Sequence, residues 1–321
     1  MIPRKSMRPS VRPRLAVLSL VLAAAPLAAA CHRGDSSDVK FDGGAALAYA
    51  GKQVGFGPRV PGTPAWQQAG DWIVAQMKTR ADTVIEQRWT HTLANGQTIP
   101  ERNILARFRP AATDRILYVT HWDSRPVADA ETDSAKKKLP IPGANDGASG
   151  VGLFVALGDA LKKAPPNVGV DLLFVDGEDY GSFGDGSSDA VPPDVLIGST
   201  YFASHLPSPG YQPIIGILWD MIGDRDLQIY QEQNSLAAAP EVVTRVWQTA
   251  ASLGYSNTFV DQPKYTVTDD HIPLIKAGLH VIDVIDLDYP DHHKLSDTMD
   301  KISAQSLETV GMVALAVIEK Q

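Results

Sequence analysis

The chain has 321 residues, of which 44% are hydrophobic and 21% charged, and this composition is typical of a globular protein. Its net charge of −8 becomes −13 once the five basic residues before position 32 are set aside, which argues against nucleic acid as a partner. The only cysteine, Cys31, lies in an apparent export signal, so thiolate catalysis and cysteine-ligated zinc are excluded.

The pattern of residues 1–31 predicts an export signal that is not part of the fold. Basic residues between Arg4 and Arg14 precede an apolar, alanine-rich run that ends at Ala30. The run is shorter than the roughly 20 residues of a membrane span. Residues 27–31 resemble a bacterial lipoprotein box, although Ala28 stands where that box usually has leucine. We expect a periplasmic or membrane-anchored lipoprotein with Cys31 lipidated; plain secretion after cleavage near Ala30 is the alternative.

The remaining chain alternates between predicted helices and strands after a polar tether at 32–42, and we expect 43–321 to form one domain. Helices are expected at 45–54, 65–78, 147–162, 240–253 and 303–320, with Thr63 and Ser303 as caps. Strands are expected at 103–107, 116–120, 168–175, 214–221, 227–230 and 281–285. The central strands are nearly continuous in Val, Ile and Leu, which predicts burial on both faces. We therefore expect a three-layer α/β/α domain with a mostly parallel central sheet.

Polar side chains follow three of these strands where each strand ends. His121 follows 116–120, Glu178 and Asp179 follow 172–175, and Asp220 ends 214–219. Ligands bind outside the carboxyl ends of strands in such sheets, so we expect the site there. The Gly/Ser/Asp-rich segment 181–195 is interpreted as a flexible rim loop, because its acidic spacing does not fit a calcium loop of the EF-hand kind.

A hydrolytic or acyl-transfer zinc site needs three protein ligands, an open position and a carboxylate base that is not a ligand. Without cysteine, the ligands must be carboxylates and imidazoles. Asp146, Asp179 and His293 form a suitable set, and Glu178 beside Asp179 is a suitable base. A serine hydrolase is disfavoured because the chain has no Gly-x-Ser-x-Gly elbow.

Several motifs together resemble the superfamily of zinc aminopeptidases, which also contains the animal-type glutaminyl cyclases. The resemblance covers essentially residues 45–320 and includes the segment 56–62 (Phe-Gly-Pro-Arg-Val-Pro-Gly). Its five ordered motifs are His121-Trp122-Asp123-Ser124, Gly143-Ala144-Asn145-Asp146, the acidic segment 174–179, the segment 219–223 (Trp-Asp-Met-Ile-Gly), and His293 before Asp297-Thr298.

The resemblance implies one of two functions. A two-zinc aminopeptidase would use His121, Asp146, Asp179, Asp220 and His293 as ligands, with Glu178 activating water. A glutaminyl cyclase would bind one zinc through Asp146, Asp179 and His293, with Glu178, Asp220 and Asp269 as catalytic acids. His121 would then be structural or orient other groups. Either enzyme would act on the N-termini of peptides or proteins, and a catalytically inactive binding protein is the non-enzyme alternative.

One acidic position favours the cyclase. The aminopeptidases typically have serine at the position of Asp269, whereas Asp269-Asp270-His271-Ile272-Pro273 resembles the cyclases. Glu178-Asp179 resembles the cyclases of some bacteria, because animal cyclases have a second glutamate. The chain departs from the animal cyclases at His292, where they have a tryptophan, and another pocket tryptophan has no counterpart here. We therefore predict a bacterial glutaminyl-peptide cyclotransferase with one zinc.

Overall fold

The computed structural model describes residues 1, 3, 9, 40–183 and 191–321. The expected export signal and lipidation site, most of the tether and the middle of the expected rim loop lie outside the described residues. Phe41, near the end of the expected tether, is buried and its backbone N–H contacts the sulfur of Met312. Among the described residues, no helix has both the length and the apolar character needed to cross a membrane.

A six-stranded sheet forms the centre of the fold, in the order β1-β2-β4-β3-β5-β8. The β4-β3, β3-β5 and β5-β8 pairs are parallel, and β1 and β2 add an antiparallel edge. This confirms the mostly parallel sheet. The strands are β1 (Thr83–Thr92), β2 (Thr98–Phe108), β3 (Arg115–His121), β4 (Gly169–Val175), β5 (Ile215–Asp220) and β8 (Val281–Ile285).

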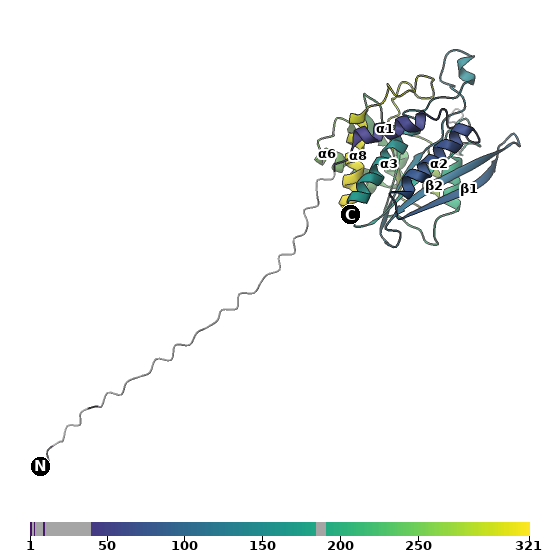
Figure 1. Cartoon of the computed structure of the whole chain (residues 1–321). Coiled ribbons are helices and arrows are strands. Elements are labelled where there is room, and N and C mark those ends of the chain that lie inside the picture. Colours follow the sequence, from purple (N-terminus) through teal and green to yellow (C-terminus); the bar gives the residue numbers. More distant parts are fainter. Residues whose placement is uncertain (2, 4–8, 10–39, 184–190) are drawn as a thin grey trace. The chain divides into compact units, whose positions relative to one another are not determined.

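Helices cover both faces of this sheet, which confirms the three layers. Side chains on alternate positions of a strand point to opposite faces, so Tyr118 packs with one group of helices while Leu117 and Val119 pack with the other. The first group is α1 (Gly43–Val54), α2 (Pro64–Lys78), α3 (Ala148–Lys163), α6 (Pro240–Ser252) and α8 (Ala304–Glu319), of which α1, α3 and α8 lie side by side in Figure 1. The second is α4 (Ile197–Ser204) and α7 (His271–Lys276).

The remaining elements extend this core. β6 (Ile229–Glu232) was expected as a strand, and it pairs with β7 (Phe259–Tyr265) in a separate two-stranded sheet. α5 (Gln233–Ala238) follows β6, and a short 3₁₀ helix η1 (Lys136–Lys138) lies in the connection from β3 to α3. Both predicted caps are confirmed, because the Thr63 and Ser303 side chains accept from the backbone N–H groups of Trp66 and Ser306.

The parallel register brings the polar clusters to one edge. His121 at the end of β3 is paired with Val175 at the end of β4, and Asp220 at the end of β5 is paired with Ile285 of β8. The connections that leave these strands therefore start from neighbouring points, as the sequence predicted.

Candidate metal centre and active site

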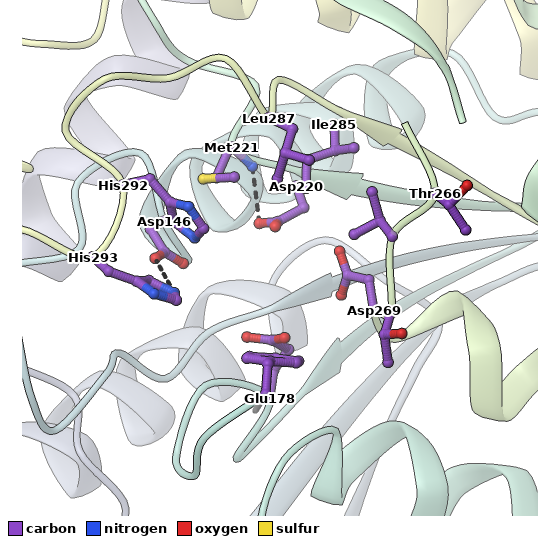
Figure 2. A pocket seen from close by; sticks show the side chains of 13 residues that line it. Asp146, Glu178, Asp220, Met221, Thr266, Asp269, Ile285, Leu287, His292 and His293 are labelled. Carbon is purple, nitrogen blue, oxygen red and sulfur yellow. Dashed lines mark hydrogen bonds and ion pairs between the residues drawn. The ribbon is translucent and has the colours of Figure 1, made fainter. Parts of the chain in front are cut away.

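A pocket of about 300 Å³ opens at this edge of the sheet (Figure 2). Asp146, Glu178, Asp220, Asp269 and His293 line it, so five predicted site residues share one cavity. The other two, His121 and Asp179, lie directly behind them: His121 contacts Asp146 and Asp220, and Asp179 contacts His293. Apolar side chains complete the wall, namely Phe183, Met221, Val267, Ile285 and Leu287.

The predicted metal ligands converge from three separate segments. The His293 Nε2 atom lies 3.2 Å from Oδ1 of Asp179 and 3.8 Å from Oδ2 of Asp146. Oδ2 of Asp146 and Oδ2 of Asp179 are both buried and have no hydrogen-bond partner. Buried carboxylate oxygens without a partner are costly unless a cation or donor satisfies them. Two carboxylates and an imidazole arranged in this way fit a zinc ion.

Among the described residues, two groups have ligand atoms within 4.8 Å of one another. The first is Asp146, His292 and His293, and the second is His121, Asp146 and Asp220. The His121 Nε2 atom lies 3.1 Å from Oδ1 of both Asp146 and Asp220, and its Nδ1 lies 3.4 Å from Oδ1 of Asp123. Both ring nitrogens therefore already have carboxylate partners. In this second group Oδ1 of Asp146 and Oδ1 of Asp220 contact His121, whereas Oδ2 of Asp146 and Oδ2 of Asp179 have no hydrogen-bond partner.

Nearby charges shift the pKa values of the two histidines in the same direction. Burial lowers the pKa of His293, but Asp179, Asp129 and Asp146 outweigh burial and raise it to about 10. Burial also opposes the charged form of His121, yet Asp220 and its other carboxylate partners raise its pKa well above the usual range. Because a metal binds only neutral imidazole, metal binding at His293 would release a proton.

Backbone geometry places Asp146 at the entrance of α3. The loop before it contains Gly143, and Gly147 follows it; both have positive φ angles, of 63° and 90°. The buried Arg59 guanidinium donates to the carbonyl oxygens of Pro142 and Gly143, at 2.6 Å for Gly143, and a Cβ atom at position 143 would lie 2.7 Å from this group. Glycine is therefore required at position 143 for the loop to wrap around the arginine.

The neighbouring carboxylates Glu178 and Asp179 are held by Asp123. One carboxylate oxygen of Asp123 accepts from the N–H of Glu178 and the other from the N–H of Asp179, each at 3.2 Å. Asp123 thus fixes the backbone from which both carboxylates extend. With the backbone fixed, Oδ1 of Asp179 lies 3.2 Å from Nε2 of His293. Glu178 extends into the pocket (Figure 2).

Glu178, Asp220 and Asp269 point into the same space in the pocket (Figure 2). Burial, with the charges of Asp179 and Asp269, raises the pKa of Glu178 well above its usual range, although His121 opposes the shift. Burial and the charges of Asp220 and Asp270 raise the pKa of Asp269 likewise. These are the properties of groups that exchange protons with a ligand near neutral pH.

Comparison with known proteins agrees with this site. The model of peptidase family M28 matches residues 103–318. The chain belongs to peptidase family M28. Members of this family with solved structures have the same fold: the glutaminyl cyclase of Bacteroides thetaiotaomicron is 34% identical, with a TM-score of 0.83 over 88% of this chain and 99% of that one.

Both of the predicted activities occur among similar structures. The glutaminyl cyclase of Porphyromonas gingivalis is 36% identical (TM-score 0.82, 88% of this chain, 99% of that chain). A leucine aminopeptidase precursor from Bacteroides thetaiotaomicron is 34% identical (TM-score 0.84, 88% and 98%). Curated relatives, some named as probable zinc metalloproteases, match over shorter segments. The chain covers 40%, 28% and 41% of the length of the first three.

Sequence reasoning missed several residues of this M28 site. Arg125 and Asp129 contact the expected ligands Asp179 and His293, and neither belongs to a motif that spacing could reveal. His271, which was expected to order its loop, is fully buried, 3.4 Å from Glu232 and 3.9 Å from Asp283. Each of these partners lies far away in the sequence, so no local pattern indicates the contact.

Proposed function

We propose that this M28 protein is a glutaminyl-peptide cyclotransferase, which converts the N-terminal glutamine of a peptide or protein into pyroglutamate and releases ammonia. The similarity to two solved bacterial glutaminyl cyclases over 88% of the chain supports this function. The similarity to a leucine aminopeptidase precursor makes a two-zinc aminopeptidase the alternative.

The position of Asp269 in the pocket favours the cyclase over the aminopeptidase. Asp269 is buried, lines the pocket, and points with Glu178 and Asp220 toward a common space (Figure 2). Ring closure transfers a proton from an amine to a departing ammonia, and several neighbouring acids with raised pKa values suit that transfer. A hydrolase needs one base to activate water, and serine is typical of the aminopeptidases at this position.

The donor set supports a single zinc ion held by Asp146, Asp179 and His293. The unpartnered oxygens belong to this group, whereas His121 and Asp220 already bind each other. When bound there, zinc would polarise the side-chain amide carbonyl of the substrate glutamine.

Glu178 would perform the proton transfers. Its carboxylate takes a proton from the substrate α-amine, whose nitrogen then attacks the amide carbon and closes the five-membered ring. Glu178 returns the proton to the leaving nitrogen, which departs as ammonia. Asp269 and Asp220 hold the substrate nitrogen through hydrogen bonds. Burial of Asp269 close to the charges of Asp220 and Asp270 raises the pKa of Asp269.

The test is product analysis with purified, zinc-loaded protein. We expect ammonia release and ring closure on a glutaminyl peptide, and no amine release from leucyl or other aminoacyl amides. Glu178→Gln should lower ring closure by at least about 100-fold, because the general base is lost. Cleavage of aminoacyl amides without ring closure would instead establish the two-zinc aminopeptidase.

We also propose that the protein is exported to a bacterial envelope and anchored by a lipid on Cys31. The support is the basic and apolar pattern of residues 1–31. Cell fractionation tests it: the full chain should co-sediment with membranes and Cys31→Ser should not. Equal distribution of both forms would refute the anchor.

A further inference from the structure

We propose that the ion pair between Arg125 and Asp129 positions two of the three expected metal ligands, and thereby sets the affinity of the site for zinc. This inference rests on the metal site of the proposed function. It concerns residues outside the motifs described above, in the connection that leaves β3 after His121.

Arg125 holds the first ligand. Its Nη1 atom lies 2.5 Å from Oδ1 of Asp179 and 3.3 Å from the backbone oxygen of the same residue. The guanidinium is nearly fully buried, with 2% of the side chain exposed. Because Arg125 occupies Oδ1, the unpartnered Oδ2 of Asp179 is the oxygen presented to a metal.

Asp129 holds the second ligand. Its Oδ1 atom lies 3.4 Å from Nδ1 of His293, while Nε2 of the same ring faces Asp179 and Asp146. A carboxylate on Nδ1 selects the tautomer in which Nε2 is free to bind a metal, and it raises the basicity of the ring. The backbone N–H of Ala130 also donates to the carbonyl of His293 at 3.3 Å, which ties the two loops together.

A bidentate ion pair joins Arg125 to Asp129. Arg125 donates from Nε to Oδ1 of Asp129 at 3.0 Å and from Nη2 to Oδ2 at 2.6 Å. The planar fork of arginine has donors for both carboxylates at once, which lysine does not. Asp179, Arg125, Asp129 and His293 thus form a closed ring of contacts, so a shift of either ligand must move the pair.

Metal titration tests this inference on the full-length protein, with zinc as the probe in competition with a chromophoric chelator. We expect Asp129→Asn to weaken zinc binding about 10- to 100-fold, the usual loss when a carboxylate behind a ligand histidine is removed. Arg125→Lys should weaken binding by a similar factor. The double variant should be only slightly weaker than either single variant, because the two residues act as one unit.

The matched control is Asp159→Asn. Asp159 forms a comparable half-buried ion pair with Arg80, at 3.0 Å, between α3 and the end of α2. The control should bind zinc like the wild type. Thermal unfolding of the metal-free proteins should show no greater loss for Asp129→Asn than for Asp159→Asn, which separates positioning from general destabilisation.

Four outcomes of these experiments decide whether the pair positions the ligands. Wild-type zinc affinity in both Asp129→Asn and Arg125→Lys would overturn the inference, as would fully additive losses in the double variant. Zinc binding that weakens as expected in a protein without ring-closing activity would refute the proposed cyclase while supporting the positioning pair. A wild type that binds no zinc would refute the inference outright.

Discussion

Neighbouring carboxylates in this site differ in function because their backbone and their partners differ. Glu178 and Asp179 are adjacent in the sequence, yet Asp179 contacts Arg125 and His293 while Glu178 lines the pocket. Asp123 accepts from both of their backbone N–H groups and so fixes the direction in which each side chain leaves the loop. The carboxylate of Asp123 behind the loop therefore separates the expected metal ligand Asp179 from the proposed proton carrier Glu178.

Asp269 is expected to be needed for ring closure but not for zinc binding. Burial and the charge of Asp220 raise its pKa, which favours a protonated carboxyl group that can donate a hydrogen bond to the substrate nitrogen in the proposed reaction. Asp269→Asn keeps the shape but cannot exchange a proton. We expect kcat for ring closure to fall about 100-fold, as measured by ammonia release, while zinc affinity is unchanged because Asp269 is not a ligand.

Thr266→Ser is the matched control, because Thr266 lines the same pocket but has a hydroxyl group in place of a carboxyl group. It should retain most of the wild-type kcat. A normal kcat in Asp269→Asn would remove the feature that distinguishes a cyclase from an aminopeptidase here. A large loss of zinc affinity in this variant would assign Asp269 to the metal site instead.

The site residues differ in how well the sequence indicates them. Asp146, Glu178, Asp179 and Asp220 follow apolar strands or precede a helix, so the geometry of a parallel sheet predicts that they meet. Asp269 depends on resemblance to the cyclases. Arg125 could not be inferred, because an arginine four residues from an acid usually indicates a surface pair rather than a buried support for a ligand.

At the scale of elements, strands with long apolar runs were predicted and strands without them were missed. β3, β4 and β5 are buried at every position, so their Val, Ile and Leu content marks them clearly. β1 has no fully buried position; it pairs with β2, and Trp89 stacks on Tyr201 of α4. Its sequence therefore lacks the apolar pattern on which the prediction depended.

Short helices escaped prediction for a related reason. α4 has 8 residues and α7 has 6, which is too few for a 3.6-residue period to be recognised. α7 nevertheless matters for the site, because it begins directly after Asp269 and Asp270 and buries His271 and Leu274. The packing of Leu274 against Leu218 and Val281 fixes the start of the helix and with it the position of Asp269.

The close packing of α1 on α3 also positions the site. A Cβ atom at Gly152 would lie 2.4 Å from the carbonyl oxygen of Ala46, so glycine allows the two helix backbones to approach. The sequence predicts both helices but not that one packs on the other. Periodicity identifies a buried face; it does not say which element covers it.

At the scale of the whole molecule, an excess of buried acids dominates the electrostatics. The chain has 37 acidic and 29 basic residues, and burial raises the pKa values of many acids. Among the described residues these acids include Glu101, Asp176, Glu178, Asp269, Asp270, Asp283, Asp286 and Asp297. Cationic partners lower the pKa of other acids, including Asp129, Asp146 and Glu232. Metal binding would therefore relieve part of a repulsion that the metal-free fold must bear.

Glu101 and Asp176 lie beside the segment 177–179, which carries Glu178 and Asp179. The pH dependence of stability at this pair tests the effect of buried acids. Burial and the charge of Asp176 raise the pKa of Glu101 well above 4.5. The folded protein thus keeps a proton that the unfolded chain releases, so its free energy of unfolding falls as pH rises above 4.5 toward the raised value. The expected slope from this pair is about 1.4 kcal/mol per pH unit in that window.

Denaturant unfolding of the chelator-treated protein across this pH range measures that slope. Glu101→Gln removes the titrating group and should flatten the dependence by about one proton, whatever its effect on stability at a single pH. Glu308→Gln, at an exposed position of α8, should keep the wild-type slope. An unchanged slope in Glu101→Gln would mean that Glu101 ionises normally in the folded protein. The buried acids beside the segment 177–179 would then not govern the pH dependence of its stability.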